Sequence, residues 1–274
     1  MGAVMVVINN GTDIVWKRRT TRKQLGIWLG WLIGISIVLF AWNVISEKTI
    51  WFFVQDAPRQ AADIGSRMIP PKWSYITKLL VPVWDTLNIA TLGTIIAMTI
   101  AVPVAFCAAR NTTPHSSVRV IALFIIVSSR SVNSLIWALM LVFILGPGVL
   151  AGTIAIGLRS IGFCAKLLYE SIEEIDESQV EAVKATGASN IQQMTYGILP
   201  QVLPTIAGVG IYRWDINIRE STILGLVGAG GIGLQLNGSI NTLAWTQVST
   251  ILLVILVTVF ISEWVSAKVR GAII

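Results

Sequence analysis

Six charged side chains lie inside stretches of sequence that are otherwise apolar and long enough to span a bilayer: Arg130, Arg159, Arg213, Asp215, Arg219 and Glu220. A charge near the centre of a bilayer costs roughly 2.5 to 3.5 kcal/mol on insertion scales, so such side chains face the protein interior or a water-filled route. The chemistry open to them is pairing with one another or attraction of a charged solute. They are therefore the first candidates for a functional site.

The sequence between positions 213 and 220 holds most of these charges. At helical spacing, Asp215 and Arg219 are four residues apart and can pair, while Arg213, Asn217 and Glu220 fall on a roughly opposite face. Two interpretations remain open. The residues form structural ion pairs that lock a bundle or a dimer interface, or an arginine lines the route of an anionic solute, the candidates being Arg130, Arg213 and Arg219.

The sequence has no constellation for catalysis. It contains no GxxxxGK[ST] phosphate-binding loop and no paired carboxylates or Ser/His pair in a plausible orientation. A GxGxxG match at Gly228–Gly233 lies between apolar stretches, without the βαβ unit that a dinucleotide site needs, so we interpret it as closely packed backbone. Cys107, Cys164 and the single histidine, His115, lack metal-ligand spacing. We therefore expect no enzymatic activity, cofactor or metal site in this chain.

Composition predicts a membrane protein. Of the 274 residues, 54% are hydrophobic and 12% are charged, and the mean hydropathy is +0.75, which is outside the range of soluble domains. The net charge of +6 would suit nucleic acid, but the basic residues lie at the ends of apolar stretches, where they set membrane orientation. We expect an all-α integral membrane protein with lipid, and no nucleic acid, around it.

The N-terminal part begins with a basic arm. Basic residues precede the first apolar stretch, as in a signal peptide: Lys17, Arg18, Arg19, Arg22 and Lys23. That stretch, at about Leu25–Ser46, is too long for a signal peptide and lacks a small-residue cleavage site, so we expect a retained span with the arm in the cytoplasm. The mixed polarity after it predicts an external segment at the membrane interface. Together these three parts form residues 1–80.

About six membrane spans are predicted, at about Leu25–Ser46, Pro82–Ala109, Val118–Leu145, Val149–Tyr169, Ile198–Leu224 and Trp245–Ala267. Polar residues at Ser128–Asn133 interrupt the third stretch and favour a broken or kinked helix. Gly146–Gly148 predicts a tight external turn, and Gly225–Gly238 a glycine-rich external loop. Six spans after a cytoplasmic arm place both termini in the cytoplasm, and residues 81–274 form the main transmembrane domain.

A polar, amphipathic stretch lies between the fourth and fifth spans, on the predicted cytoplasmic side. Ser178 followed by Glu181 fits a capping box that starts a short helix, and Gly187 tolerates the positive φ at which such a helix ends. Ser189 followed by Gln192 repeats the capping pattern. The pattern predicts a helix, a tight turn and a second short helix, which serve either as a connector or as a docking site.

This helical unit, at about residues 178–196, and the residues just after it contain Glu181-Ala182-Val183, Gly187 and Leu199-Pro200. This spacing resembles the EAA motif of ABC importer permeases, a coupling helix that docks into a groove on the ATPase subunit. The chain departs from the family pattern at Val183, where the family has Ala, and at Gly197, where it has Ile. The resemblance implies that the unit couples ATP hydrolysis to movement of the spans. The residues assigned to this coupling are Glu181, Ala182, Val183, Gly187, Ala188, Leu199 and Pro200.

A second set of motifs is spread over about residues 80–270 and comprises Arg130-Ser131, Leu135–Leu139, Tyr196–Pro204, Tyr212–Thr222 and Leu224–Gly233. These motifs resemble the permeases of phosphonate importers, a family that includes phosphite and hypophosphite transporters. The resemblance implies the fold of a type I ABC importer permease. It also implies that the chain moves phosphonate or a related phosphorus oxyanion across a bacterial plasma membrane by alternating access.

The same resemblance implies the partners. They are a dimer of ATPase subunits that binds ATP and Mg, a second copy of this permease or a paralogue, and an external or periplasmic solute-binding protein. Two alternatives remain. One is a type I permease for another small solute, such as an amino acid or a sulfonate; the other is an ion-coupled secondary transporter, which would show internal repeats that are not evident in this sequence.

Overall fold

The computed structural model describes residues 6–9, 14–17 and 21–273, and the chain divides into two compact units, Met1–Asp63 and Ile64–Ile274. The elements, in chain order, are β1 (Val6–Asn9), β2 (Ile14–Lys17), α1 (Thr21–Lys48), α2 (Trp51–Met68), η1 (Trp73–Tyr75), α3 (Ile76–Ala108), α4 (Ser116–Ser131), α5 (Ser134–Leu145), α6 (Val149–Glu173), α7 (Glu177–Ala185), α8 (Asn190–Gln192), η2 (Gln193–Ile198), α9 (Leu199–Leu224), η3 (Gly225–Val227), α10 (Ile232–Asn241) and α11 (Trp245–Ile273).

The first unit departs from the all-helical prediction at its N-terminal end. β1 and β2 form a two-stranded antiparallel sheet in which Val6 is opposite Lys17. The predicted basic residues Arg18 and Arg19 lie outside the described residues. The prediction of helices holds for the rest of the described chain, from Thr21 onward.

α1 contains the predicted first span. It is strongly apolar, and its residues are exposed on all sides within this unit, which is the pattern of a helix surrounded by lipid. At its end, Trp51 of α2 donates from Nε1 to the carbonyl oxygen of Ser46 at 3.2 Å, and its ring lies 6.3 Å from that of Trp42. These contacts fix the corner between α1 and α2.

Among the described residues, five helices are long and apolar enough to cross a membrane, and a sixth span results if the bent pair α4 and α5 counts as one. The predicted break in the third span is confirmed: α4 and α5 meet at an angle of 86°. Val132 is extended between them, and Asn133 Oδ1 accepts from the backbone N–H of Leu135 at 3.1 Å, which starts α5 with a side-chain cap.

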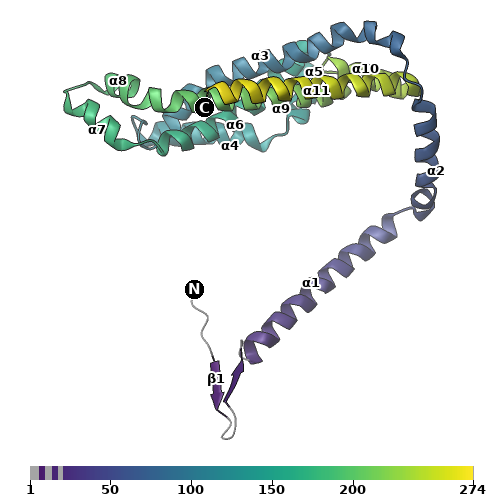
Figure 1. The fold of residues 1–274 in the computed structure, drawn as a ribbon, viewed down its shortest axis with the longest axis horizontal. Coiled ribbons are helices and arrows are strands. Elements are labelled where there is room, and N and C mark those ends of the chain that lie inside the picture. The colour runs from purple at the N-terminus through teal and green to yellow at the C-terminus, as the bar shows by residue number, and fades with distance from the viewer. Residues whose placement is uncertain (1–5, 10–13, 18–20, 274) are drawn as a thin grey trace. The chain divides into compact units, whose positions relative to one another are not determined.

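The second unit is a bundle with α6 at its centre. α3, α9 and α11 run along one another, α7 and α8 lie at one end, and α10 lies at the other end (Figure 1). Small residues allow the helices to approach closely: a Cβ at Gly93 of α3 would lie 2.9 Å from Cγ2 of Ile156 on α6. Many of the buried residues on α3 and α6 are accordingly alanine or glycine.

The glycine-rich segment after α9 is not the simple loop that we predicted, because it contains η3 and the helix α10. Its glycines do pack backbone against backbone, as predicted. Gly228 has a φ of +91° and its carbonyl oxygen accepts from the N–H of Gly148 at 3.0 Å. A Cβ at Gly233 would lie 1.9 Å from the carbonyl oxygen of Thr222, so only glycine fits there.

Candidate functional site

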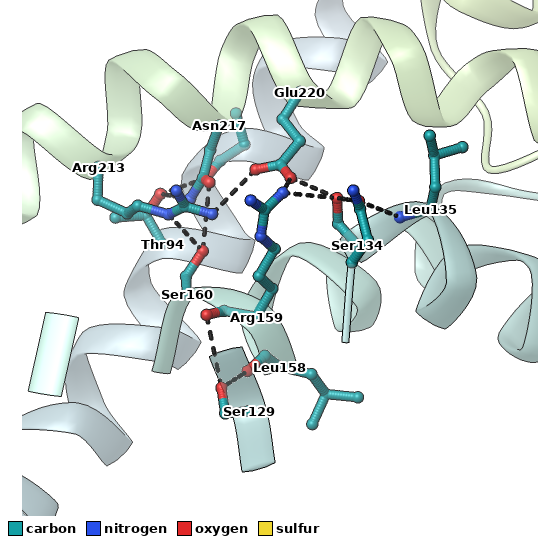
Figure 2. A network of polar contacts seen from close by, with 12 residues as sticks. Thr94, Ser129, Ser134, Leu135, Leu158, Arg159, Ser160, Arg213, Asn217 and Glu220 are labelled. Carbon is teal, nitrogen blue, oxygen red and sulfur yellow. Dashed lines mark hydrogen bonds and ion pairs between the residues drawn. The ribbon is translucent and has the colours of Figure 1, made fainter. Parts of the chain in front are cut away.

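A network of charged and polar side chains, most of them buried, lies where α5, α6 and α9 meet (Figure 2). At its centre, the carboxylate of Glu220 accepts from Arg213 Nη2 at 2.9 Å, from Arg159 Nη1 and from the hydroxyl of Ser134. Two guanidinium groups thus share one carboxylate. The three charged side chains together carry one net positive charge.

Arg213 is held by further contacts in the interior of the bundle. Its Nε donates to Ser160 Oγ at 2.8 Å, and that hydroxyl donates to Asn217 Oδ1 at 3.2 Å. Asn217 Nδ2 donates to Thr94 Oγ1 at 2.8 Å, and the Arg213 guanidinium lies 5.0 Å from the ring centroid of Phe163. These contacts join α3, α6 and α9, and they satisfy polar groups that have no access to water.

A second ion pair lies on a different face of α9. The predicted pair between Asp215 and Arg219 is confirmed, and Asp215 Oδ1 also accepts from the hydroxyl of Ser262 on α11 at 2.9 Å. The Asp215 side chain is buried, whereas that of Arg219 is half exposed. This pair is neutral and joins α9 to α11.

Arg159 is the more accessible of the two arginines that bond Glu220. Its side chain is 37% exposed, against 3% for Arg213. Among the described residues only its Nη1 is bonded, to Glu220 and, at 3.3 Å, to the hydroxyl of Ser134. The other N–H groups of Arg159 are therefore left to donate to water or to an oxyanion, for which a guanidinium is well suited.

The structure separates the residues that the sequence singled out. It brings Arg213, Asn217 and Glu220 into one network, whereas Arg130 is exposed at the end of α4 and makes no ion pair with another described residue. Arg159 was recognised as a charge in an apolar stretch but not as a candidate for the solute route. The polar residues missed altogether are Thr94, Ser134, Ser160 and Ser262; their positions inside apolar stretches were the available signal.

The helix that carries the predicted coupling motif starts earlier than expected. Asp176, not Ser178, caps α7: its Oδ1 accepts from the backbone N–H of Ser178 at 3.0 Å and from the Ser178 hydroxyl at 2.7 Å. These two hydrogen bonds hold the pKa of the Asp176 carboxyl below its ordinary value. The capping box predicted at Ser178 and Glu181 is therefore wrong, and Glu181 is left exposed on the surface of α7.

The turn after α7 is as predicted. Gly187 has a φ of +82°, and its N–H donates to the carbonyl oxygen of Lys184 at 3.0 Å. The predicted capping box at Ser189 and Gln192 is also present.

The predicted second short helix, however, is not separate. α8 continues through the π-helical turn η2 into α9, where the N–H of Leu199 bonds the carbonyl oxygen of Met194, five residues earlier. Pro200 explains the π turn, because it lacks an N–H and its ring crowds the carbonyl four residues before it.

Most of the predicted coupling residues line one hollow. Its volume is about 640 Å³, and it lies between α7 and the segment that follows the turn. Three predicted coupling residues do not line it: Glu181 on the exposed surface of α7, and Leu199 and Pro200 at the start of α9. The residues around the hollow are Ala182, Val183, Thr186, Gly187, Ala188, Gln192 and Tyr196.

Comparison with known proteins identifies the family. A family model described as the inner membrane component of binding-protein-dependent transport systems matches residues 101–271. The chain belongs to this family. It is thus the multi-pass permease component of an ABC transporter in the inner membrane and not the ATPase. The prediction of an ABC permease is confirmed, and an ion-coupled secondary transporter is excluded.

Two curated relatives carry names that mention phosphorus compounds. The phosphite transport system permease protein of Stutzerimonas stutzeri is 38% identical over 251 residues, which is 89% of this chain and 91% of the relative. The phosphate-import permease protein of Mycolicibacterium smegmatis is 39% identical over 204 residues, which is 74% of this chain but only 38% of that relative. The first similarity covers nearly the whole of both chains.

A solved structure shows the same fold. The chain is similar to the permease in inward-facing conformations of a methionine ABC transporter, with a TM-score of 0.64 and 20% identity, over 74% of this chain and 99% of that one. The similarity confirms the predicted helical fold of a type I importer permease.

Proposed function

We propose that this chain is the permease of an ABC importer for a phosphorus oxyanion, with phosphite or a phosphonate as its solute. One observation carries the proposal. Arg159 and Arg213 share the carboxylate of Glu220, and Arg159, the more exposed of the two, has N–H groups that bond no other described residue. The name of the relative that is similar over most of its length supports phosphite as the anion.

In this proposal the charged and polar residues of the spans divide into two roles, locking the bundle and lining the anion route. Arg213, Asn217 and Glu220 lock α9 to α3 and α6, because their polar groups already have partners. Asp215 and Arg219 lock α9 to α11. Arg159 is left as the group on the anion route, and Arg130, exposed at the break before α5, is a second candidate at its edge.

The net positive charge of the cluster formed by Arg159, Arg213 and Glu220 suits the passage of an anion. An anion that enters the bundle loses water, and a guanidinium replaces that hydration with charge-assisted hydrogen bonds. Because Glu220 cancels one of the two positive charges, the site carries a single excess charge. Conduction requires binding that is favourable enough for entry and weak enough for release, and a partly neutralised arginine meets both conditions.

The segment around α7 is the proposed contact with the ATPase. The hollow lined by Ala182, Val183 and Ala188 gives a partner side chain a place to insert, and the exposed Glu181 lies on the same helix. ATP binding would close a pair of ATPase subunits and displace α7, and the spans would switch between outward and inward access. A second copy of the chain or a paralogue, and a solute-binding protein on the outer side, complete the proposed transporter.

The proposed topology follows from this contact. If α7 faces the ATPase, residues 178–196 lie in the cytoplasm, and six spans place both termini there as well. Residues 1–80 then form a cytoplasmic arm, the first span and an external interfacial segment, and residues 81–274 form the transport domain. Cysteine accessibility labelling of residues on α7 and α10 from each side of the membrane tests this arrangement.

The function is tested with the reconstituted complex of permease, ATPase and binding protein. ATP hydrolysis is measured with the binding protein in the presence of phosphite, methylphosphonate, phosphate or methionine. We expect stimulation by phosphite or the phosphonate and none by methionine. Stimulation by methionine alone would overturn the proposal.

Inorganic phosphate is the second candidate solute. The observation that favours it is the similarity to the phosphate-import permease of Mycolicibacterium smegmatis, although the chain covers little more than a third of that protein. Phosphate and phosphite differ by one oxygen that replaces a hydrogen on phosphorus, and Arg159 would bond the oxygens of either. The same hydrolysis assay separates them, because stimulation by phosphate at concentrations where phosphite has no effect would favour the second candidate.

A further inference from the structure

Gln201, in the first turn of α9, joins the start of α7 to the start of α9. Its side-chain Oε1 accepts from the backbone N–H of Asp176 at 3.0 Å. Its Nε2 donates to the carbonyl oxygen of Asp176 at 3.3 Å and to that of Gly197 at 2.7 Å. One carboxamide thus holds both backbone groups of Asp176 and ties them to the backbone that leads into α9.

Asp176 is the residue from which α7 begins. Its carboxylate caps α7, and its backbone groups are bonded by Gln201, so the first turn of α7 is attached to α9 by hydrogen bonds and not only through the connecting chain. The backbone hydrogen-bonding groups of a connecting segment need partners, and here the partner belongs to a membrane span.

Gly197, in η2, brings α7 into direct contact with the segment that leads into α9. It is buried, and a Cβ placed on it would lie 3.3 Å from Cα of Val180 and 3.7 Å from Cβ of Val180. The Ile that the coupling motif of the family has at this position would push α7 away from η2. The glycine therefore permits the close packing that Gln201 secures with hydrogen bonds.

The backbone between α7 and α9 needs such a connection. η2 is a π-helical turn, and Pro200 and Pro204 remove two backbone donors from the first turns of α9. A displacement of α7 would be absorbed by bending of this weakened stretch unless other contacts clamped α7 against it. The bonds of Gln201 run directly from Asp176 to the helix beyond the π turn.

We infer that Gln201 is a positioning residue through which displacement of α7 is transmitted to α9, so that the two helices move as one body. The inference rests on the proposed function, in which α7 docks on the ATPase. α9 carries Arg213 and Glu220, so the movement that starts at α7 reaches the proposed anion site along a single helix.

The test is the ratio of solute taken up to ATP hydrolysed, measured in proteoliposomes with the complete transporter. Gln201→Ala removes all three side-chain hydrogen bonds, and we expect this ratio to fall about tenfold while the complex still assembles. Thr195→Ala is the matched control, because Thr195 Oγ1 bonds only Ile191 within the same segment. Gln201→Glu keeps the acceptor for Asp176 but places a carboxylate against two carbonyl oxygens, and we expect it to be no better than the alanine variant.

A disulfide should replace the lost hydrogen bonds. The separation of 3.7 Å between Cβ atoms at positions 180 and 197 suits a disulfide. In a chain without native cysteines (Cys107→Ser, Cys164→Ala), we combine Gln201→Ala with Val180→Cys and Gly197→Cys. Oxidation should restore the ratio of uptake to hydrolysis, and reduction should lower it again. A general loss of folding would not be reversed by this bond, so the rescue isolates the positioning role.

The failure of this inference is distinguishable from failure of the proposed function. Ala182→Asp places a charge on the hollow of α7 and tests docking itself. If Ala182→Asp lowers the ratio but Gln201→Ala does not, α7 docks and the inference about Gln201 is overturned. If neither variant lowers the ratio, the docking role of α7 is wrong. An oxidised disulfide that leaves the ratio low would also overturn the inference.

Discussion

Arg213 and Glu220 lie two turns apart on α9 and form an ion pair in which Nη2 is 2.9 Å from Oε2. Arg159 of α6 bonds the other oxygen of the same carboxylate. The carboxylate therefore fixes an arginine of its own helix and an arginine of the neighbouring helix at once. An anion that binds Arg159 would contact a group whose position depends on α9, and α9 is the helix that begins at the proposed coupling segment.

Loss of the shared carboxylate should destabilise the protein. In Glu220→Gln, Arg213 and Arg159 lose their counter-charge, and removal of one partner of a buried ion pair typically costs about 3 to 5 kcal/mol. The measurement is the thermal unfolding temperature of the purified complex in detergent. Glu263→Gln is the control, since Glu263 is exposed on α11. Equal unfolding temperatures for the two variants would contradict the structural role of Glu220.

Loss of Arg159 should affect the solute more than the fold. Glu220 keeps Arg213 as its partner in Arg159→Gln, so the unfolding temperature should change little. We expect KM for uptake to rise about tenfold, which corresponds to about 1.4 kcal/mol of lost interaction. Arg159→Lys keeps the positive charge, so its KM for uptake should rise less than that of Arg159→Gln.

The control for this effect is Lys78→Gln, which removes one positive charge from an exposed position on α3. Uptake by the control should match that of the unaltered protein. An unchanged KM in Arg159→Gln would remove this residue from the anion route.

The glycine-rich segment allows a test within a single helix. In Gly233→Ala the new methyl group meets the carbonyl oxygen of Thr222, and we expect a loss of about 1 to 3 kcal/mol from overpacking. Gly238→Ala, also on α10, places its methyl group in open space and should be neutral or slightly stabilising. Thermal unfolding of the two variants compares them directly. Equal stability would show that α9 and α10 do not pack as closely as the structure indicates.

The membrane spans could be predicted from the sequence because the length of an apolar stretch is enough to identify a helix that crosses the bilayer. The break in the third span was also predictable, since Ser128–Asn133 puts a polar run inside an apolar stretch. The pair of Asp215 and Arg219 followed from a spacing of four residues on one helix. Each of these features depends on residues that are close in sequence.

Contacts between distant residues could not be predicted in the same way. Arg159 bonds Glu220 across 61 positions, and Asn217 bonds Thr94 across 123, which the spacing of either helix does not reveal. The cap of α7 was missed for another reason. Asp176 and Ser178 are both good capping residues, and the Glu three positions after the serine favoured the wrong one.

The turn after α7 should be sensitive to its backbone conformation. Gly187 has a φ of +82°, and alanine in this region costs about 1 kcal/mol. Gly187→Ala should loosen the end of α7 and lower uptake per ATP about fivefold. The control is Gly208→Ala on α9, where the added methyl group meets nothing within 4 Å and φ is not positive. The same uptake per ATP in both variants would argue against a rigid turn.

Uptake of the anion itself is the direct assay of whether this permease carries a phosphorus oxyanion. Proteoliposomes that contain the complete transporter, with ATP on the ATPase side and the binding protein on the other, are given radiolabelled phosphite. We expect ATP-dependent accumulation of phosphite that unlabelled methylphosphonate reduces and methionine does not. No accumulation of phosphite, methylphosphonate or phosphate by a complex that hydrolyses ATP would contradict it.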